Sequence, residues 1–400
     1  MTSEEFIAIE NEHGAHNYKP LDVVLCKGQG VWVEDVDGKK YMDFLAAYSA
    51  VNQGHCHPRL VAAMKRQAEK LALTSRAFRN DQLPLLAKEL CELLGYEMML
   101  PMNSGAEAVE TAIKAARKWG YQIKGVAPDK AEIIVCDGNF HGRTITIISF
   151  SPEPQYRDGF GPFTPGFKMI PFGDIAALEK SITPNTVAFL IEPIQGEGGI
   201  VVPPTGYLHQ AMTICKQQNV LLIADEIQSG LGRTGKLLAC EHENVRPDMV
   251  TIGKALSGGM YPISAVLASK EILGVFKPGD HGSTYGGNPL ACAIAREAIK
   301  VIVEERLCER SAELGDYLMH RLLQITSPHV ETYRGKGLWI GIVMKKTAGA
   351  ARRFCEALKD QGILAKDTHE HIIRLAPPLI ISKTEIDWAV ERIAKVLAMP

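Results

Sequence analysis

Short apolar runs without alternation recur in the middle of the chain, separated by polar, glycine-containing segments. The clearest runs cover residues 131–137, 186–192, 220–225 and 248–253, and most of them are rich in branched side chains. Such runs are typical of strands that are buried on both faces of a parallel sheet. Because helical patterns lie between them, residues from about 50 to 285 predict a doubly wound α/β domain.

The pattern changes at both ends of the chain. Residues 30–44 contain two strand-like runs on either side of Asp37-Gly38, which predicts a hairpin. Residues 289–400 mix helical patterns with two strand-like runs and predict a smaller α+β domain. The helical patterns cover 290–324, 347–361 and 383–398, and the strand-like runs cover 337–343 and 371–375.

Two of the apolar runs end in residues that suit cofactor chemistry. The run at 220–225 ends in Asp225, and the run at 248–253 leads directly to Lys254. In open α/β sheets, ligands bind beyond the carboxyl ends of the strands. A lysine that forms a Schiff base and an acid that keeps a pyridine nitrogen protonated are the groups that a pyridoxal phosphate (PLP) enzyme needs. Each residue alone is more often a solvated lysine or a turn-forming acid, but the pair favours PLP chemistry.

The clearest helix of the chain is expected at residues 103–119. A capping residue, early glutamates and alanine-rich interior turns support it. Its start contains Ser104, Gly105 and Ala106, whose small side chains leave backbone N–H groups open to a phosphate. An ordinary capped helix explains the same segment, so the segment alone does not indicate a binding site.

The loop at 138–144 follows the apolar run at 131–137 and carries two candidate binding residues. Phe140 could stack on a flat cofactor ring. Arg143 could bind a substrate carboxylate through two parallel hydrogen bonds. A packed phenylalanine and a solvated arginine are the alternatives.

Composition and charge exclude several classes of protein. With 46% hydrophobic and 22% charged residues, the 400-residue chain is ordinary for a soluble globular enzyme. Its formal net charge of −2 gives no field that would attract nucleic acid or an anionic membrane. No apolar run is long enough to cross a bilayer. The acidic N-terminus lacks a signal or transit pattern, so we expect a cytoplasmic protein.

The cysteines and histidines do not predict a disulfide framework or a metal site. Nine cysteines without a Cys-x-x-Cys pair are expected to be small buried residues. His55-Cys56-His57 suggests metal ligands, but adjacent side chains diverge and no further ligands stand at metal-site spacing. No metal is therefore expected.

Residues 230–235 fit the G-x-G-x-x-G pattern of dinucleotide-binding proteins. That motif should open a helix directly after its strand, and here five residues intervene. A mobile turn is the simpler interpretation. An NAD-dependent dehydrogenase remains the alternative from a different class of enzyme.

Five motifs of the chain resemble those of the class III PLP-dependent aminotransferases, which have the fold type I architecture. The resemblance extends over essentially the whole chain. It implies a large PLP-binding domain at residues 49–288, and a small domain in which segment 1–48 joins residues 289–400. It also implies a homodimer or larger assembly with shared active sites. The motifs are Asn103-Ser-Gly-Ala-Glu-Ala, Asn139-Phe-His-Gly-Arg-Thr, Glu192-Pro-Ile-Gln-Gly-Glu, Ala224-Asp-Glu-Ile-Gln-Ser-Gly-Leu-Gly-Arg-Thr-Gly and Ile252-Gly-Lys-Ala-Leu.

The same resemblance implies which residues hold PLP. Lys254 would form the Schiff base, Asp225 would pair with the pyridine nitrogen, and Gln228 would hydrogen-bond the phenolic oxygen. Phe140 would stack on the ring. The groups expected at the phosphate are Ser104, Gly105 and Ala106 at the helix start, together with the partner subunit's Ser283 and the partner subunit's Thr284.

Within this class the chain most resembles the ornithine aminotransferases. They transfer the δ-amino group of L-ornithine to 2-oxoglutarate, a reaction of arginine metabolism and proline biosynthesis. The products are glutamate and glutamate 5-semialdehyde, which cyclises to pyrroline-5-carboxylate because its amine and aldehyde are tethered. The narrower motifs are Gly14-Ala-His-Asn-Tyr-Lys-Pro-Leu and Tyr48-Ser-Ala-Val-Asn-Gln-Gly-His-Cys-His-Pro.

This narrower resemblance implies the substrate-binding residues. Tyr18 would bind the α-amine of ornithine and Arg143 its α-carboxylate, with Tyr48 in the same pocket. Glu197 would mask Arg374 as an ion pair until 2-oxoglutarate enters. The related alternatives are an acetylornithine or γ-aminobutyrate aminotransferase and an aminomutase, and a non-catalytic binding protein on the same fold is a further one.

Overall fold

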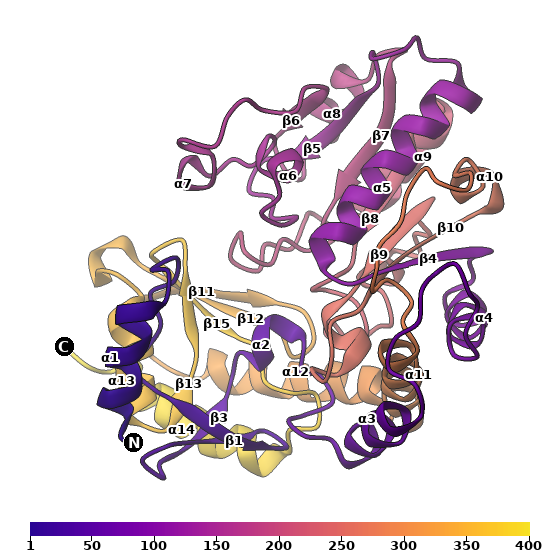
Figure 1. Ribbon diagram of the computed structural model, residues 1–400. Coiled ribbons are helices and arrows are strands. Elements are labelled where there is room, and N and C mark those ends of the chain that lie inside the picture. The colour runs from indigo at the N-terminus through magenta and orange to yellow at the C-terminus, as the bar shows by residue number, and fades with distance from the viewer.

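The computed structural model describes all 400 residues, and the chain forms two parts (Figure 1). The larger part is built on a seven-stranded sheet, in which only β10 runs against its neighbours. The mainly parallel sheet confirms the predicted α/β fold. In order across the sheet, the strands are β4 (Met98–Met102), β10 (Ser264–Ala268), β9 (Met249–Ile252), β8 (Leu221–Asp225), β7 (Thr186–Ile191), β5 (Glu132–Cys136) and β6 (Phe167–Ile170).

Helices cover both faces of this sheet. Successive side chains of a strand point to opposite faces. Ile133 of β5 therefore packs in a core cluster with α5 (Gly105–Trp119). Its neighbour Ile134 packs in another cluster with α8 (Ile175–Ser181) and α9 (Tyr207–Gln217). Burial on both faces explains why the central strands lack an alternating polar pattern.

The smaller part contains two four-stranded sheets. The predicted N-terminal hairpin is present, and its strand β3 pairs in parallel with β13, where Met42 lies opposite Ile363. The N-terminal strands thus share a sheet with the C-terminal region. One sheet consists of β1 (Leu25–Gln29), β2 (Trp32–Asp35), β3 (Lys40–Asp43) and β13 (Ile363–Leu364), and the other of β11 (Val330–Gly335), β12 (Ile340–Met344), β15 (Ile372–Leu375) and β14 (Lys366–Thr368).

The helical pattern predicted at 290–324 is interrupted. Arg306 has a φ of 54°, in the left-handed region, and separates two helices there. No helix of the structure combines the length and the apolar character that crossing a membrane requires. The remaining α-helices are α1 (Ser3–His13), α3 (Pro58–Lys70), α4 (Leu83–Leu94), α6 (Ile145–Ile148), α7 (Pro154–Arg157), α10 (Lys270–Leu273), α11 (Pro289–Glu304), α12 (Leu307–Leu323), α13 (Arg352–Asp360) and α14 (Lys383–Leu397).

The largest hydrophobic cluster has 49 buried residues and draws on all three predicted segments of the chain, from Val31 to Leu397. Within it, α11 packs against α3 and α4 of the preceding segment. In Figure 1, the indigo N-terminal helix α1 lies beside the yellow C-terminal elements. The division of the chain at residues 48 and 288 stays a prediction.

A left-handed turn, α2 (Ala46–Ser49), follows the N-terminal hairpin. All four residues have positive φ values, between 47° and 72°, and none of them is glycine. Asp43 supports the start of the turn, because its Oδ1 accepts hydrogen bonds from the N–H groups of Leu45 and Ala46. The Oδ2 of the same carboxylate lies 2.8 Å from Nε2 of His55. Tyr48 thus lies on a backbone in the left-handed conformation, which is unfavourable for residues that have a β-carbon.

Candidate active site

Asp225, the last residue of β8, is buried and fully hydrogen-bonded. Its Oδ1 accepts from the N–H of Ile227 and from the hydroxyl of Thr251, both at 3.1 Å. Its Oδ2 accepts from Nδ1 of the buried His141 at 2.7 Å. Burial alone would lower the pKa of His141, but the hydrogen bond and the charge of Asp225 outweigh burial and raise it. His141 was not among the predicted site residues.

Lys254 begins the short 3-10 turn η3 (Lys254–Ser257) directly after β9. Its φ is 44°, an unusual value for a residue with a side chain and typical of functional sites. Burial lowers the pKa of Lys254, although the nearby carboxylates of Asp225, Glu197 and Glu192 act in the opposite direction. A lysine with a lowered pKa is a better nucleophile and proton carrier near neutral pH.

Glu192 follows β7 and is a further buried carboxylate of the site. It accepts hydrogen bonds from the N–H groups of Phe140, at 2.9 Å, and Gly196, at 3.2 Å. Burial raises the pKa of Glu192 to about 7, although the charge of His141 opposes this shift. Three strand ends of the sheet thus bring Asp225, Glu192 and Lys254 together, as the rule for open α/β sheets requires.

The start of α5 has free backbone donors. Ser104 is the capping residue, and its side chain is engaged with Glu107 in a capping box. The N–H groups of Gly105 and Ala106 have no acceptor in the chain and carry the positive end of the helix dipole. The pattern confirms the predicted helix and leaves two donors for an anion.

Ser283 of the same chain lies beside this helix start. Its Oγ accepts a hydrogen bond of 2.8 Å from Nδ2 of Asn103, and Thr284 next to it is exposed. The side chain of Asn103 also donates to Glu107, so the loop and the helix start are tied together. A contribution of these hydroxyls across a subunit interface stays a prediction.

Phe140 and Arg143 lie in the predicted loop, and a second aromatic residue, Tyr156, joins them. The ring of Phe140 meets that of Tyr156 edge to face, with centroids 6.2 Å apart. The guanidinium carbon of Arg143 lies only 3.5 Å from the ring centre of Tyr156, a close cation–π contact. Tyr156, on the short helix α7, holds Arg143 at the edge of the site and was not predicted.

The buried Arg374 forms an ion pair with the partly buried Glu197. Nη1 of Arg374 lies 2.6 Å from Oε1 of Glu197, and Nε2 of Gln228 donates to the same oxygen at 3.2 Å. Burial opposes ionisation of Glu197, but the charge of Arg374 outweighs it and lowers the pKa of Glu197. Nε of Arg374 has no hydrogen-bond acceptor in the chain, so the guanidinium retains a free donor. The ring of Tyr48 covers the guanidinium at 5.2 Å.

Tyr18 is largely exposed, with 74% of its surface accessible. Tyr18 is among the groups that raise the pKa of Tyr48, which indicates that the two tyrosines lie near one another. The binding role of Tyr18 stays a prediction.

The dinucleotide interpretation of residues 230–235 is wrong. These residues form turns and do not open a helix, and β-carbons at Gly232 and Gly235 would lie about 3 Å from side chains of Leu379 and Ala312. Arg233 between them is fully buried and donates to two backbone carbonyls. The glycines allow the turn to approach α12 closely, which is a packing role.

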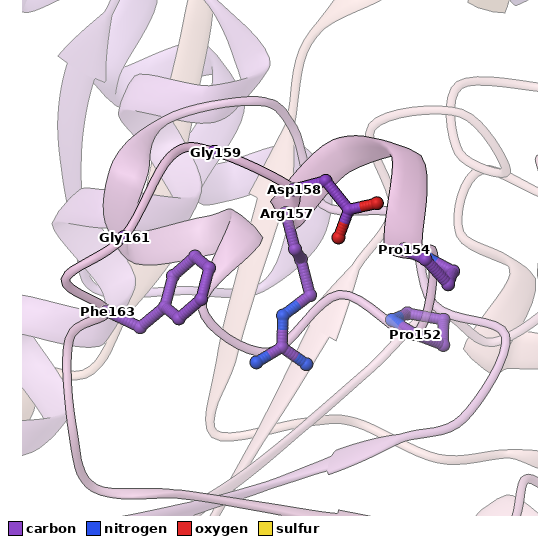
Figure 2. A pocket seen from close by; sticks show the side chains of 7 residues that line it. All are labelled: Pro152, Pro154, Arg157, Asp158, Gly159, Gly161 and Phe163. Atoms are coloured by element: carbon purple, nitrogen blue, oxygen red, sulfur yellow. The ribbon is translucent and has the colours of Figure 1, made fainter.

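The hollow in Figure 2, of about 400 Å³, lies outside the cluster around Lys254. It is walled by the loop around α7, and the guanidinium of Arg157 lies 4.7 Å from the ring centre of Phe163 there. None of the predicted site residues lines it. Its lining residues are Pro152, Pro154, Arg157, Asp158, Gly159, Gly161 and Phe163.

Comparison with known proteins decides the family. The family model "Aminotransferase class-III" matches residues 13–397, which is nearly the whole chain. The chain is a class-III aminotransferase. The aminotransferase is 58% identical to an ornithine aminotransferase of Geobacillus sp. (strain WCH70) over 394 residues, 98% of each chain. It is 56% identical to the ornithine aminotransferase of Bacillus subtilis (strain 168) over 395 residues, 99% of this chain and 98% of that one.

Solved structures agree with this assignment of the aminotransferase. The crystal structure of the ornithine aminotransferase from Toxoplasma gondii ME49 superposes with a TM-score of 0.98 at 46% identity, and covers 99% of this chain and 95% of that one. An acetylornithine aminotransferase from Elizabethkingia anophelis superposes with a TM-score of 0.90 at 51% identity, over 99% of both chains. A further Toxoplasma gondii structure is described as having partial occupancy of PLP at its active site.

Class-III aminotransferases use PLP, and the residues of this aminotransferase fit that cofactor. The two free N–H groups at the start of α5 suit a phosphate. Lys254 and Asp225 end neighbouring strands of the sheet, as an amine for a Schiff base and an acid for a ring nitrogen must. The buried Oε1 of Gln228 has no partner in the chain, so the side-chain amide has an end free for a ligand.

Proposed function

We propose that this aminotransferase transfers the δ-amino group of L-ornithine to 2-oxoglutarate. The products are glutamate and glutamate 5-semialdehyde, which cyclises to pyrroline-5-carboxylate. The two relatives with 58% and 56% identity over nearly the whole chain are ornithine aminotransferases. The observation that carries the proposal is the ion pair of Arg374 with Glu197, because it withholds an α-carboxylate site from the amino donor.

The proposed chemistry uses few residues of the chain. When bound, PLP supplies a ring that delocalises the negative charge formed at the reacting carbon. Lys254 attaches the cofactor and, once free, moves a proton at that carbon as base and then as acid. Asp225, hydrogen-bonded by His141, keeps a proton on the ring nitrogen. The N–H groups of Gly105 and Ala106 bind the phosphate.

Ornithine has two amines, and the proposed site selects the δ one by its charges. Tyr18 binds the α-amine, and Arg143 binds the α-carboxylate through its guanidinium fork. Arg374 would otherwise hold the α-carboxylate and present the α-amine, but Glu197 neutralises it. When 2-oxoglutarate enters, Glu197 turns away, Arg374 binds the α-carboxylate and Arg143 binds the distal one.

The proposed assembly is a homodimer with shared active sites, in the cytoplasm. Ser283 and Thr284 of each chain would complete the phosphate site of its partner. Residues 49–288 would form the PLP-binding domain, and 1–48 with 289–400 the small domain. The parallel pairing of β3 with β13 supports this grouping.

A panel of amino donors with 2-oxoglutarate tests the proposal. We expect L-ornithine to be the best donor by kcat/KM, and the cyclic product to be trapped from that reaction. N-acetylornithine is the second candidate, because the acetylornithine aminotransferase from Elizabethkingia anophelis is 51% identical to this chain. A preference for N-acetylornithine or γ-aminobutyrate would overturn the proposal, and a preference for an α-amino donor would contradict the role of Glu197.

A further inference from the structure

One hairpin contains Arg374 and also contacts the loop that contains Glu197. In the hairpin β14–β15, Thr368 lies opposite Ile372, and Arg374 is two residues further along β15. Directly opposed residues and residues two apart lie on the same face of a sheet. Thr368, Ile372 and Arg374 therefore form one face of the hairpin. All three contact the short loop that contains Glu197.

The loop around Glu197 is rich in glycine. Glu197 stands between Gly196 and the pair Gly198-Gly199, and glycine allows the widest range of backbone conformations. The loop lies against the hairpin so closely that a β-carbon on Gly199 would come within 2.3 Å of Cδ1 of Ile372. The N–H groups of Gly199 and Ile200 both donate to the carbonyl of Gly196 and hold the turn, and contacts from outside the loop add to this restraint on Glu197.

Thr368 supplies such a contact. Its hydroxyl donates a hydrogen bond of 2.7 Å to the backbone carbonyl of Glu197 itself. We propose that Thr368 is a positioning residue that fixes the main chain of Glu197 so that its carboxylate masks Arg374. This inference rests on the proposed function and adds a determinant of the choice between the δ-amine and the α-amine.

The direction of the effect follows from what each state of Glu197 requires. The masked state needs the carboxylate within contact distance of Arg374, whereas the unmasked state has no such requirement. Without the hydroxyl of Thr368, the glycine-flanked backbone can adopt more conformations, and this costs the masked state more than the unmasked one. Arg374 would then be available to α-carboxylates for a larger share of the time.

The test compares Thr368→Val, which removes the hydroxyl at similar volume, with Thr368→Ser, which keeps it. For Thr368→Val in the holoenzyme we expect kcat/KM for L-glutamate, relative to that for L-ornithine, to rise about two- to tenfold, the range of one hydrogen bond. Glutarate, a dicarboxylate that cannot react, should bind more tightly by a similar factor in calorimetry. Should Thr368→Val fail to fold, Thr368→Ala makes the same comparison.

Thr213→Val is the matched control, because the Thr213 hydroxyl also donates to a backbone carbonyl, at 2.9 Å, on the exposed face of α9. Thr368→Ser and Thr213→Val should both behave as the unmodified enzyme. Glu197→Ala separates the two hypotheses. If Glu197→Ala raises activity on L-glutamate but Thr368→Val does not, the role of Thr368 is wrong. If Glu197→Ala has no such effect, the masking role in the proposed function is itself wrong.

Discussion

At the scale of single residues, some charged groups of the site have hydrogen-bond or ion-pair partners, and one charged group does not. Asp225 accepts three hydrogen bonds, and Arg374 is paired with Glu197. Lys254 is partly buried, its amine lies near carboxylates without forming an ion pair with them, and burial lowers its pKa. An amine that loses part of its hydration without gaining an ion-pair partner destabilises the folded state, and this is a common feature of reactive sites.

We therefore expect Lys254→Met to stabilise the protein prepared without cofactor. The lysine has a lower pKa in the folded than in the unfolded chain, where it is near 10.5, so its charge opposes folding at neutral pH. The charge of Lys254 lowers the free energy of unfolding, and this loss is recovered as pH rises from the lowered pKa of the folded protein to 10.5. Urea unfolding at pH 7 and at pH 10 should give a larger advantage of the variant at pH 7. An equal advantage at both would contradict the argument.

Tyr156 should affect substrate binding through Arg143. Tyr156→Leu removes the ring that the guanidinium contacts at 3.5 Å, whereas Tyr156→Phe keeps it. Since a cation–π contact contributes about 0.5–2 kcal/mol, KM for ornithine should rise about two- to thirtyfold in Tyr156→Leu with little change in kcat. Steady-state kinetics of both variants make the comparison. A fall in kcat alone would mean that Tyr156 acts elsewhere.

The sequence allowed some of these residues to be predicted and not others. Asp225 and Lys254 could be predicted because each follows an apolar run, and the same rule applied to the run at 186–192 could have found Glu192. His141 and Tyr156 carry no local signal of this kind. Their roles arise from contacts with residues distant in the sequence, which periodicity does not contain.

At the scale of elements, the left-handed turn α2 stands out because no residue in it is glycine. Each side chain in this region of φ costs about 1–2 kcal/mol, so the turn exists only because its surroundings hold it. The carboxylate of Asp43 and the burial of Ala46 and Ser49 provide that support. The turn presents Tyr48 to Arg374.

Ala47→Gly should stabilise the protein, because Ala47 is exposed and has a φ of 47°. Glycine removes the clash of the β-carbon, and the greater freedom of the unfolded chain offsets part of the gain, so we expect about 0.5–1 kcal/mol. Ala68→Gly in the helix α3, also at an exposed position, is the control and should destabilise by up to about 1 kcal/mol. Chemical unfolding of both variants gives the comparison, and destabilisation by Ala47→Gly would refute the strain argument.

Some elements could be predicted from the sequence and others could not. The buried strands were predictable because their apolar runs are uninterrupted. The break between α11 and α12 was not, because the helical pattern continues through Arg306, whose φ is positive. Residues 46–49 contain no glycine that would signal a left-handed turn.

At the scale of the whole molecule, exposed apolar side chains lie near Ser283 and Thr284, whose hydroxyls are predicted to bind the phosphate. Nδ2 of Asn80 donates to the carbonyl of Gly287, so the segments around residues 78 and 285 lie together. Phe78 is 70% exposed and Tyr285 is 48% exposed. Large exposed aromatic residues beside a ligand site are typical of a subunit interface.

We therefore expect Phe78→Asp to weaken the proposed dimer and, with it, retention of PLP. A charge in an apolar interface loses its hydration, and separated subunits would lack the hydroxyls of their partners. Light scattering should give the mass of two chains for the unmodified protein and a smaller mass for the variant. Phe160→Asp, at another exposed phenylalanine (55%), is the control and should remain dimeric. A monomeric unmodified protein would contradict the assembly.

The pairing of β3 with β13 has a consequence for biosynthesis. During translation, Met42 leaves the ribosome long before Ile363, its partner in the sheet. The early hairpin must therefore wait with one edge uncovered while the seven-stranded sheet is made, and uncovered edges invite pairing with other chains. Nascent forms of this enzyme should thus depend on chaperones until the last hundred or so residues emerge, a delay that its long-range contacts impose.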